Sequence, residues 1–297
     1  MAIKPESNQI DLKGLDIENK YLFSKFELER NKWLNWFKGE PEHSLSDQIY
    51  RMLWDDAVFR LSNEMRRIKI QFQDKATGIN GDLAHLIDRG YVNLQATSIR
   101  SLIDARTDVI SLPRIIKDLE KNVGLITREN YVCYDGKKFD PKENDDDLNE
   151  VIVDYRHKAF DKLCNATEVE RKRSDLINPD IFSKLLEELS NCKDIKIFAN
   201  KFIAHKADST SLGGLEDEQR GITLDRIHEY HKIILRVSNF IYGALMGEGE
   251  LGGIPTPQYN IFEDLDKPWI NRKNLEGLGE FWHSHVEKLN QTPPFEP

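Results

Sequence analysis

One stretch decides the fold: SLSDQIYRMLWDDAVFRLSNEMRRIKIQF, residues Ser44 to Phe72. Its apolar residues recur at three- and four-residue intervals, the spacing of one face of an α-helix. Ser44, followed three residues later by Asp47, is similar to a capping box and marks the start of that helix. The stretch therefore predicts a long amphipathic helix whose buried stripe comprises Ile49, Leu53, Ala57, Leu61, Met65, Ile68 and Phe72.

The same period continues on both sides of this helix, and no stretch shows the sustained alternation of a β-strand. Gly39 and Pro41 end a first helix, Ser111 caps a later one, and Thr223 caps a strong helix near the end of the bundle. The sequence predicts an all-α bundle of about six to eight helices. The further bundle helices are expected over residues 17–38, 81–106, 111–119, 148–165, 179–204 and 224–246, with a short helical turn over 127–134 and a helix of the C-terminal extension over 274–289.

The composition changes after Gly247, where the chain reads GEGELGGIPTP. Glycine and proline at this density end a helical bundle. We therefore predict two parts, a helical domain over residues 1–247 and an extension over residues 248–297. The extension is too short to have a core of its own and is expected to pack as an arm on the bundle or on a partner chain.

Composition and charge exclude several classes of protein. No apolar run reaches the roughly 20 residues of a membrane span, and the N-terminus lacks the order of a signal peptide, so a cytoplasmic protein is expected. Cys133, Cys164 and Cys192 are odd in number and far apart, which indicates reduced thiols and no thiolate metal site. We expect no metal and no cofactor. The net charge of −9 disfavours general affinity for nucleic acids, so any RNA contact must use local clusters of Lys and Arg.

The residues most suited to chemistry lie in KDIKIFANKFIAHKAD, Lys193 to Asp208. Lys201 precedes His205 by four residues, so a helix places both on one face. Asn200 adds a carboxamide, and Lys196 and Lys206 add charge. An imidazole, an amine and a carboxamide suit phosphate binding and proton transfer on a ribose hydroxyl. The alternative is structural, with His205 at a helix end hydrogen-bonding locally.

ANKFIAHKAD resembles the signature of HEPN domains, helical-bundle proteins of prokaryotic defence and toxin systems, and in particular their abortive-infection U-type branch. The family pattern is an arginine, a polar residue, and then a histidine that often stands in Ala-His-x-x-Asp. Asn200, Ala204, His205 and Asp208 match it. The arginine is absent, and Ala199 stands in its place. A second stretch, IRSLIDARTDVISLPRII from Ile99 to Ile116, is similar to an earlier helix of the same group, and the resemblance spans about 17–247.

The resemblance implies an HEPN-like bundle with an extra N-terminal helix and a C-terminal arm. It implies a homodimer, RNA or a nucleotide as ligand, an antitoxin-like protein partner, and metal-independent cleavage of RNA. His205, Asn200 and Lys201 would be catalytic. The residues that would bind substrate are Arg106, Asp108, Lys196, Lys206 and Asp208. With the arginine missing, Lys201 or Arg106 would hold the phosphate, or the chain is a catalytically inactive binding module; an arginine restored at position 199 would distinguish the two.

One further residue group has a structural default, and two others keep two interpretations each. Arg100 and Asp104 are spaced to form a salt bridge along a helix. His231 lies on an apolar stripe, so it either faces the site or is a buried, hydrogen-bonded core residue. The basic run Arg171 to Arg173 is either part of an RNA-binding patch or an ordinary solvated surface.

Overall fold

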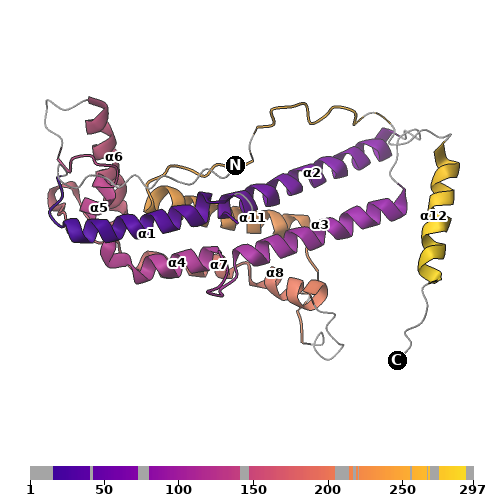
Figure 1. The fold of residues 1–297 in the computed structure, drawn as a ribbon, viewed down its shortest axis with the longest axis horizontal. Coiled ribbons are helices and arrows are strands. Elements are labelled where there is room, and N and C mark those ends of the chain that lie inside the picture. Colours follow the sequence, from indigo (N-terminus) through magenta and orange to yellow (C-terminus); the bar gives the residue numbers. More distant parts are fainter. Residues whose placement is uncertain are drawn as a thin grey trace. The chain divides into compact units, whose positions relative to one another are not determined.

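The computed structural model describes residues 16–40, 43–72, 80–140, 147–204, 214–216, 219, 221–254, 256–265, 267 and 274–291. In these ranges every regular element is a helix, and the β-type pairing consists of one isolated antiparallel bridge between Thr127 and Leu176. The all-α fold predicted from the helical period is confirmed (Figure 1).

The longer helices match the predicted segments in most cases. They are α1 (Lys20–Lys38), α2 (Leu45–Phe72), α3 (Gly81–Leu102), α4 (Leu112–Lys121), α6 (Asp147–Cys164), α7 (Asp180–Ser190), α11 (Leu224–Asn239) and α12 (Leu275–Asn290). The short ones are η1 (Val123–Leu125), α5 (Arg128–Cys133), η2 (Glu168–Glu170), α8 (Lys193–Phe198) and two π-helices, η3 (Ala199–Ala204) and η4 (Phe240–Leu245).

The chain forms two compact units. The first comprises Met1–Arg60 and His85–Pro255, and the second comprises Leu61–Ala84 and Thr256–Pro297. Helix α2 therefore begins in the first unit and ends in the second, while α3 returns to the first. The boundary predicted after Gly247 stays a prediction.

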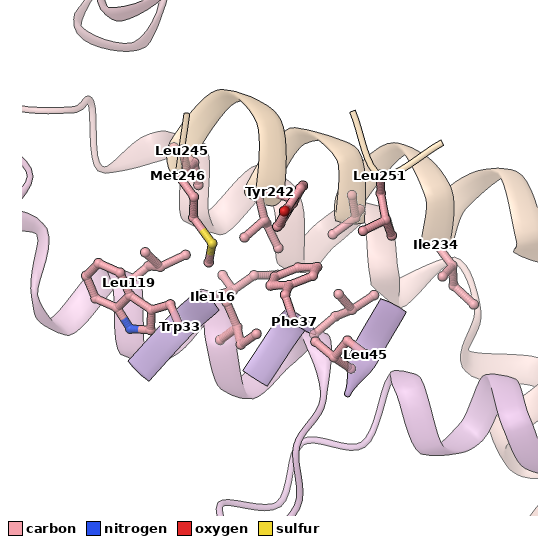
Figure 2. Packing of buried hydrophobic residues seen from close by; sticks show 14 of the residues in the cluster. Trp33, Phe37, Leu45, Ile116, Leu119, Ile234, Tyr242, Leu245, Met246 and Leu251 are labelled. Carbon is pink, nitrogen blue, oxygen red and sulfur yellow. The ribbon is translucent and has the colours of Figure 1, made fainter. Parts of the chain in front are cut away.

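The core of the first unit is formed largely by aromatic and branched side chains (Figure 2). The ring centroids of Phe37 on α1 and Tyr242 on η4 lie 5.4 Å apart. The indole Nε1 of Trp33 donates a 2.7 Å hydrogen bond to the Asp118 carboxylate at the edge of this core, so its one polar atom is satisfied. The buried residues labelled in the view are Trp33, Phe37, Leu45, Ile116, Leu119, Ile234, Tyr242, Leu245, Met246 and Leu251.

Side-chain caps fix where several helices begin. The hydroxyl oxygen of Ser44 accepts the N–H of Asp47 at 3.2 Å, Ser111 accepts that of Arg114, and Thr223 accepts that of Arg226. Each cap satisfies one of the four N–H groups that a helix start leaves free, and its removal typically costs about 1 kcal/mol. The caps predicted at Ser44, Ser111 and Thr223 are confirmed.

The first turn of α5 is bound to an irregular segment that is distant in sequence. The main-chain N–H of Arg128 donates to the carbonyl of Asp175 at 2.9 Å, and that of Glu129 donates to the carbonyl of Arg173 at 3.0 Å. Thr127 caps the same turn by accepting the N–H of Asn130. All residues of α5 are buried, so this short helix is part of the core.

Two predicted helix ends are wrong. Helix α3 ends at Leu102 rather than near Arg106, because the N–H of Asp104 bonds the carbonyl of Ser101 and tightens the last turn. The helix predicted to run from Pro179 into the HEPN-like stretch breaks after Ser190. At the break the N–H groups of Asn191 and Cys192 bond the carbonyls of Glu188 and Leu189, three residues back, so α7 ends in a tightened turn and α8 starts after Cys192 as a separate helix.

The described elements of the second unit are the end of α2, the start of α3, and α12. Helix α12 confirms the helix predicted near the C-terminus. Four of its described apolar residues are at least half exposed: Leu275, Leu278, Phe281 and Trp282. None of the helices described in either unit has the length and hydrophobicity that a bilayer span requires.

Candidate functional site

The described part of the HEPN-like stretch from Lys193 to Asp208, residues 193–204, forms α8 and continues into the π-helix η3. Ile195 and Ala199 point into the core, where both are buried. Phe198 and Phe202 stack with their ring centroids 5.2 Å apart. Single π-turns widen a helix locally and often occur at functional sites.

The HEPN-like stretch from Ile99 to Ile116 contains a tight loop that is organised by Asp104. One carboxylate oxygen of Asp104 accepts the main-chain N–H of Arg106 and the other accepts its Nε, both at 3.1 Å. The hydroxyl of Ser111 donates to the carbonyl of Asp104 at 2.5 Å while it caps α4. Asp104 thus bonds Arg106 within the loop between α3 and α4 and also Ser111 at the end of that loop.

The electrostatics place the two stretches near each other. Burial would raise the pKa of the Asp104 carboxyl, but hydrogen bonds from Arg106 and the positive charges of Arg106 and Lys196 lower it overall. Lys196 belongs to α8 and is half-buried. Its charge therefore reaches a carboxylate that belongs to the other stretch.

The structure brings together some of the predicted site residues. Arg106 and Lys196 both act on Asp104. Asp108 is exposed on the same loop, and Asn200 is half-buried on η3, but no described hydrogen bond or ion pair joins either of them to this group. Lys201 is half-buried one residue after Asn200. His205, Lys206 and Asp208 lie outside the described residues.

Helix α8 is held from its other side by α11. Asp194 forms a 2.8 Å ion pair with Arg226 in the first turn of α11. Glu188 on α7 forms a 2.7 Å ion pair with Arg236 further along α11. These two ion pairs connect α7 and α8, the helices on either side of the break at Cys192, to α11.

The predicted pair between Arg100 and Asp104 is absent among the described contacts. Because α3 ends at Leu102, Asp104 no longer follows Arg100 on a helix face and binds Arg106 instead. The Nε of Arg100 is closed off from solvent and has no hydrogen-bond partner within the described ranges. The sequence predicted neither the pairing of Asp104 with Arg106 nor the unbonded Nε of Arg100. Both depend on where α3 ends.

The basic run from Arg171 to Arg173 is neutralised within the chain. Arg171 binds the carboxylate of Asp161, with the shortest contact at 2.7 Å. Arg173 binds Asp16 and Glu129 at 3.0 and 2.8 Å. These two guanidinium groups therefore bind carboxylates of the same chain. This disfavours the interpretation of the run as an RNA-binding patch.

His231 is a buried core residue, as one of the two interpretations predicted. It is 2% exposed, and its Nε2 lies 2.9 Å from the side-chain oxygen of Gln95. Its Nδ1 lies 3.8 Å from Asp56, which also binds Tyr91 and Arg60. Burial, partly offset by the Asp56 charge, lowers the pKa of His231 to about 4.

Stability is expected to fall as the pH drops from about 6.5 to about 4. The folded protein keeps His231 neutral in this window while the unfolded chain binds a proton, so acid favours unfolding. Lowering a pKa from 6.5 to about 4 corresponds to a loss of roughly 3 kcal/mol at most. Urea unfolding at pH 7, 5.5 and 4.5 should show a steeper loss in the wild type than in His231→Gln. The exposed neighbour His228, replaced by Gln, is the control, and an equal loss in all three proteins would contradict the expectation.

The described residues give little support to disulfide chemistry or to a metal site. All three cysteines are free thiols, with Cys133 and Cys192 buried. Within the described ranges no three His, Cys, Asp or Glu side chains are grouped as metal ligands would be. Comparisons of the chain with protein-family models, curated proteins and solved structures find no match.

Proposed function

We propose that the protein is an HEPN-like, metal-independent endoribonuclease that acts in prokaryotic defence as a homodimer and has a protein partner of antitoxin type. The observation that carries the proposal is the arrangement around Asp104, where Arg106 from one HEPN-like stretch and Lys196 from the other act on one carboxylate. The Arg106 side chain is 63% exposed, unlike the mostly buried Arg171 and Arg173, so its remaining N–H groups stay open to a phosphate beside the carboxylate. The resemblance implies the reaction, and the contacts around Asp104 support the location of the phosphate-binding site.

In the proposed reaction the 2′-hydroxyl of a ribose loses its proton to His205 and its oxygen attacks the adjacent phosphorus. The bond from phosphorus to the 5′-oxygen breaks, which leaves a 2′,3′-cyclic phosphate and a 5′-hydroxyl that takes up a proton. No electrons leave the substrate and no metal is required. Positive side chains stabilise the extra charge on the phosphate oxygens in the transition state.

The test is cleavage of single-stranded RNA in the presence of EDTA. Cleavage should persist with the chelator and should yield 2′,3′-cyclic phosphate ends. The same strand with 2′-O-methyl groups throughout should remain intact, because the attacking hydroxyl is blocked. A reaction that stops with EDTA, or that cuts the methylated strand, contradicts the proposal.

One observation favours a second candidate, a silent member of the same family that binds RNA without cutting it. Ala199, the position of the missing arginine, is 2% exposed in the core. An arginine could not occupy it without burying a charge, so this chain is built without the motif guanidinium. RNA binding without cleavage in the EDTA assay would favour this candidate.

Replacing Ala199 by arginine is expected to destabilise the fold by at least about 2 kcal/mol, because the site has no room and no partner for a charge. Its half-buried neighbour Asn200 provides the matched control. Asn200→Arg should cost less than about 1 kcal/mol and is the better place to restore a guanidinium. Urea unfolding of both variants checks this, and equal stabilities would show that position 199 is not a core site.

A further inference from the structure

Arg100 is a cation without a described partner. It lies in the last turn of α3 and is half-buried, with its Nε sealed from solvent and unbonded within the described ranges. The nearest carboxylate in sequence, Asp104, is already bound to Arg106 through two hydrogen bonds. Buried polar groups are almost always paired, so an unpaired guanidinium N–H requires an explanation.

The helix end explains Arg100 only in part. A cation in the last turn of a helix is favoured by the helix dipole. That gain is smaller than the cost of sealing a charged N–H from water without an acceptor. Nε itself is sealed, but within the described ranges neither terminal nitrogen of Arg100 is a sealed atom without a partner and the residue is only half-buried, so an anion can reach the guanidinium through those nitrogens.

Arg100 lies close in sequence to the site around Asp104. Asp104 follows Arg100 by four residues, and Arg106 and Lys196 lie around Asp104. Asp104 and Asp108 are the carboxylates of the same loop, and Asp104 is the one that binds Arg106. Three cations, Arg100, Arg106 and Lys196, thus belong to the end of α3, its loop and α8.

We propose that Arg100 is the phosphate-binding arginine of this protein. It would hold a phosphate of the RNA backbone from α3, in place of the guanidinium that the buried position 199 excludes. A guanidinium can bind two phosphate oxygens at once and remains charged at any working pH. The inference rests on the proposed function, since it names the residue that binds the substrate of that site.

The test is binding of a fluorescent 2′-O-methyl RNA 12-mer, which is not cleaved, measured by anisotropy over a range of salt concentrations. Arg100→Gln should weaken binding by roughly tenfold and lower the slope of log affinity against log salt by about 0.7, the value for one lost phosphate contact on a single strand. Arg100→Lys should keep the slope but bind less tightly, because an amine cannot form the paired contact. Arg89→Gln is the control: Arg89 is exposed on the same face of α3, three turns earlier, and its loss should change neither quantity.

Stability separates a binding role from a structural one. An arginine that only holds the fold together would make Arg100→Gln unfold at a lower urea concentration, whereas an unpaired cation can be removed with no loss. If Arg100→Gln does not fold, Arg100→Lys decides: unchanged affinity overturns the proposal.

Two failures can be told apart. A wild-type protein that binds no RNA at all overturns the proposed function, and the role of Arg100 with it. A wild type that binds while Arg100→Gln binds equally well, with the same salt slope, overturns the role of Arg100 alone. Inorganic phosphate and a free nucleotide serve as competitors, and displacement of RNA at low phosphate concentration from the wild type but not from Arg100→Lys would show that a single phosphate is enough.

Discussion

Replacing Arg128 by methionine is expected to destabilise the fold by about 3–5 kcal/mol, because it removes one partner of a buried charge cluster. The Arg128 side chain is fully buried. Its Nε donates to Asp175 at 2.9 Å, and one terminal nitrogen donates to Asp161 at 2.7 Å and to the carbonyl of His157 at 3.2 Å. Methionine fills a similar volume but leaves the two carboxylates short of a cation.

The remaining partners of these carboxylates limit the loss but do not remove it. Asp161 keeps Arg171, and Asp175 keeps the main-chain N–H of Lys172. Burial would raise the pKa of Asp161, but the hydrogen bonds and charges of Arg171 and Arg128 lower it overall. The stability that comes with a lowered carboxyl pKa is present above the unfolded value and is lost as the pH falls through the folded value. Arg128→Met should therefore lose part of this acid-sensitive stability as well.

Arg236→Met is the matched control. Arg236 also contacts a carboxylate at 2.7 Å, that of Glu188, but its side chain is 66% exposed. An exposed pair contributes little, so this variant should lose less than about 1 kcal/mol. Urea unfolding of the three proteins measures the difference. Similar losses for Arg128→Met and Arg236→Met would show that the interior of the cluster is hydrated.

Replacing His205 by alanine is expected to lower the rate of RNA cleavage by about a hundredfold or more, within the range that a general acid or base contributes. The same variant should bind the 2′-O-methyl strand with nearly wild-type affinity, because the phosphate contacts are assigned to arginine and lysine. The measurement is the initial cleavage rate in EDTA.

The control for His205→Ala is His283→Ala, which removes an exposed imidazole from α12. His205→Ala cleaving as fast as His283→Ala would remove the catalytic role. A large fall in unfolding stability with little change in rate would support the alternative in which His205 is a structural residue of a helix end.

The features predicted correctly are those that local chemistry determines. Ser111 and Thr223 mark helix starts because a hydroxyl can bond an N–H only three residues away. The period of apolar residues in Ser44–Phe72 predicted α2 from that stretch alone, but its buried stripe is confirmed only in part: Ile49 and Leu53 are buried, whereas Met65 and Ile68 are 37% and 44% exposed. His231 lies on an apolar stripe, which made a buried position one of its two interpretations.

The features missed depend on partners that are distant in sequence. Arg128 lies 33 residues from Asp161 and 47 from Asp175, so nothing near it indicated a fully buried guanidinium. The pairing of Asp104 with Arg106 depends on the end of α3 at Leu102, two residues before Asp104. For the candidate site, the sequence supplied Arg106 and Lys196, while the effect of both charges on the Asp104 pKa depends on where the fold places α8.

The attachment of α5 to residues 173–175 affects local unfolding of the protein. The first amide hydrogens of a helix ordinarily face water, and those of Arg128 and Glu129 instead bond carbonyls of an irregular segment. Deuterium can replace them only when that segment separates from the helix. The two pieces therefore form one cooperative opening unit, or foldon, and slow exchange at these amides would report on the 173–175 segment as much as on the helix itself.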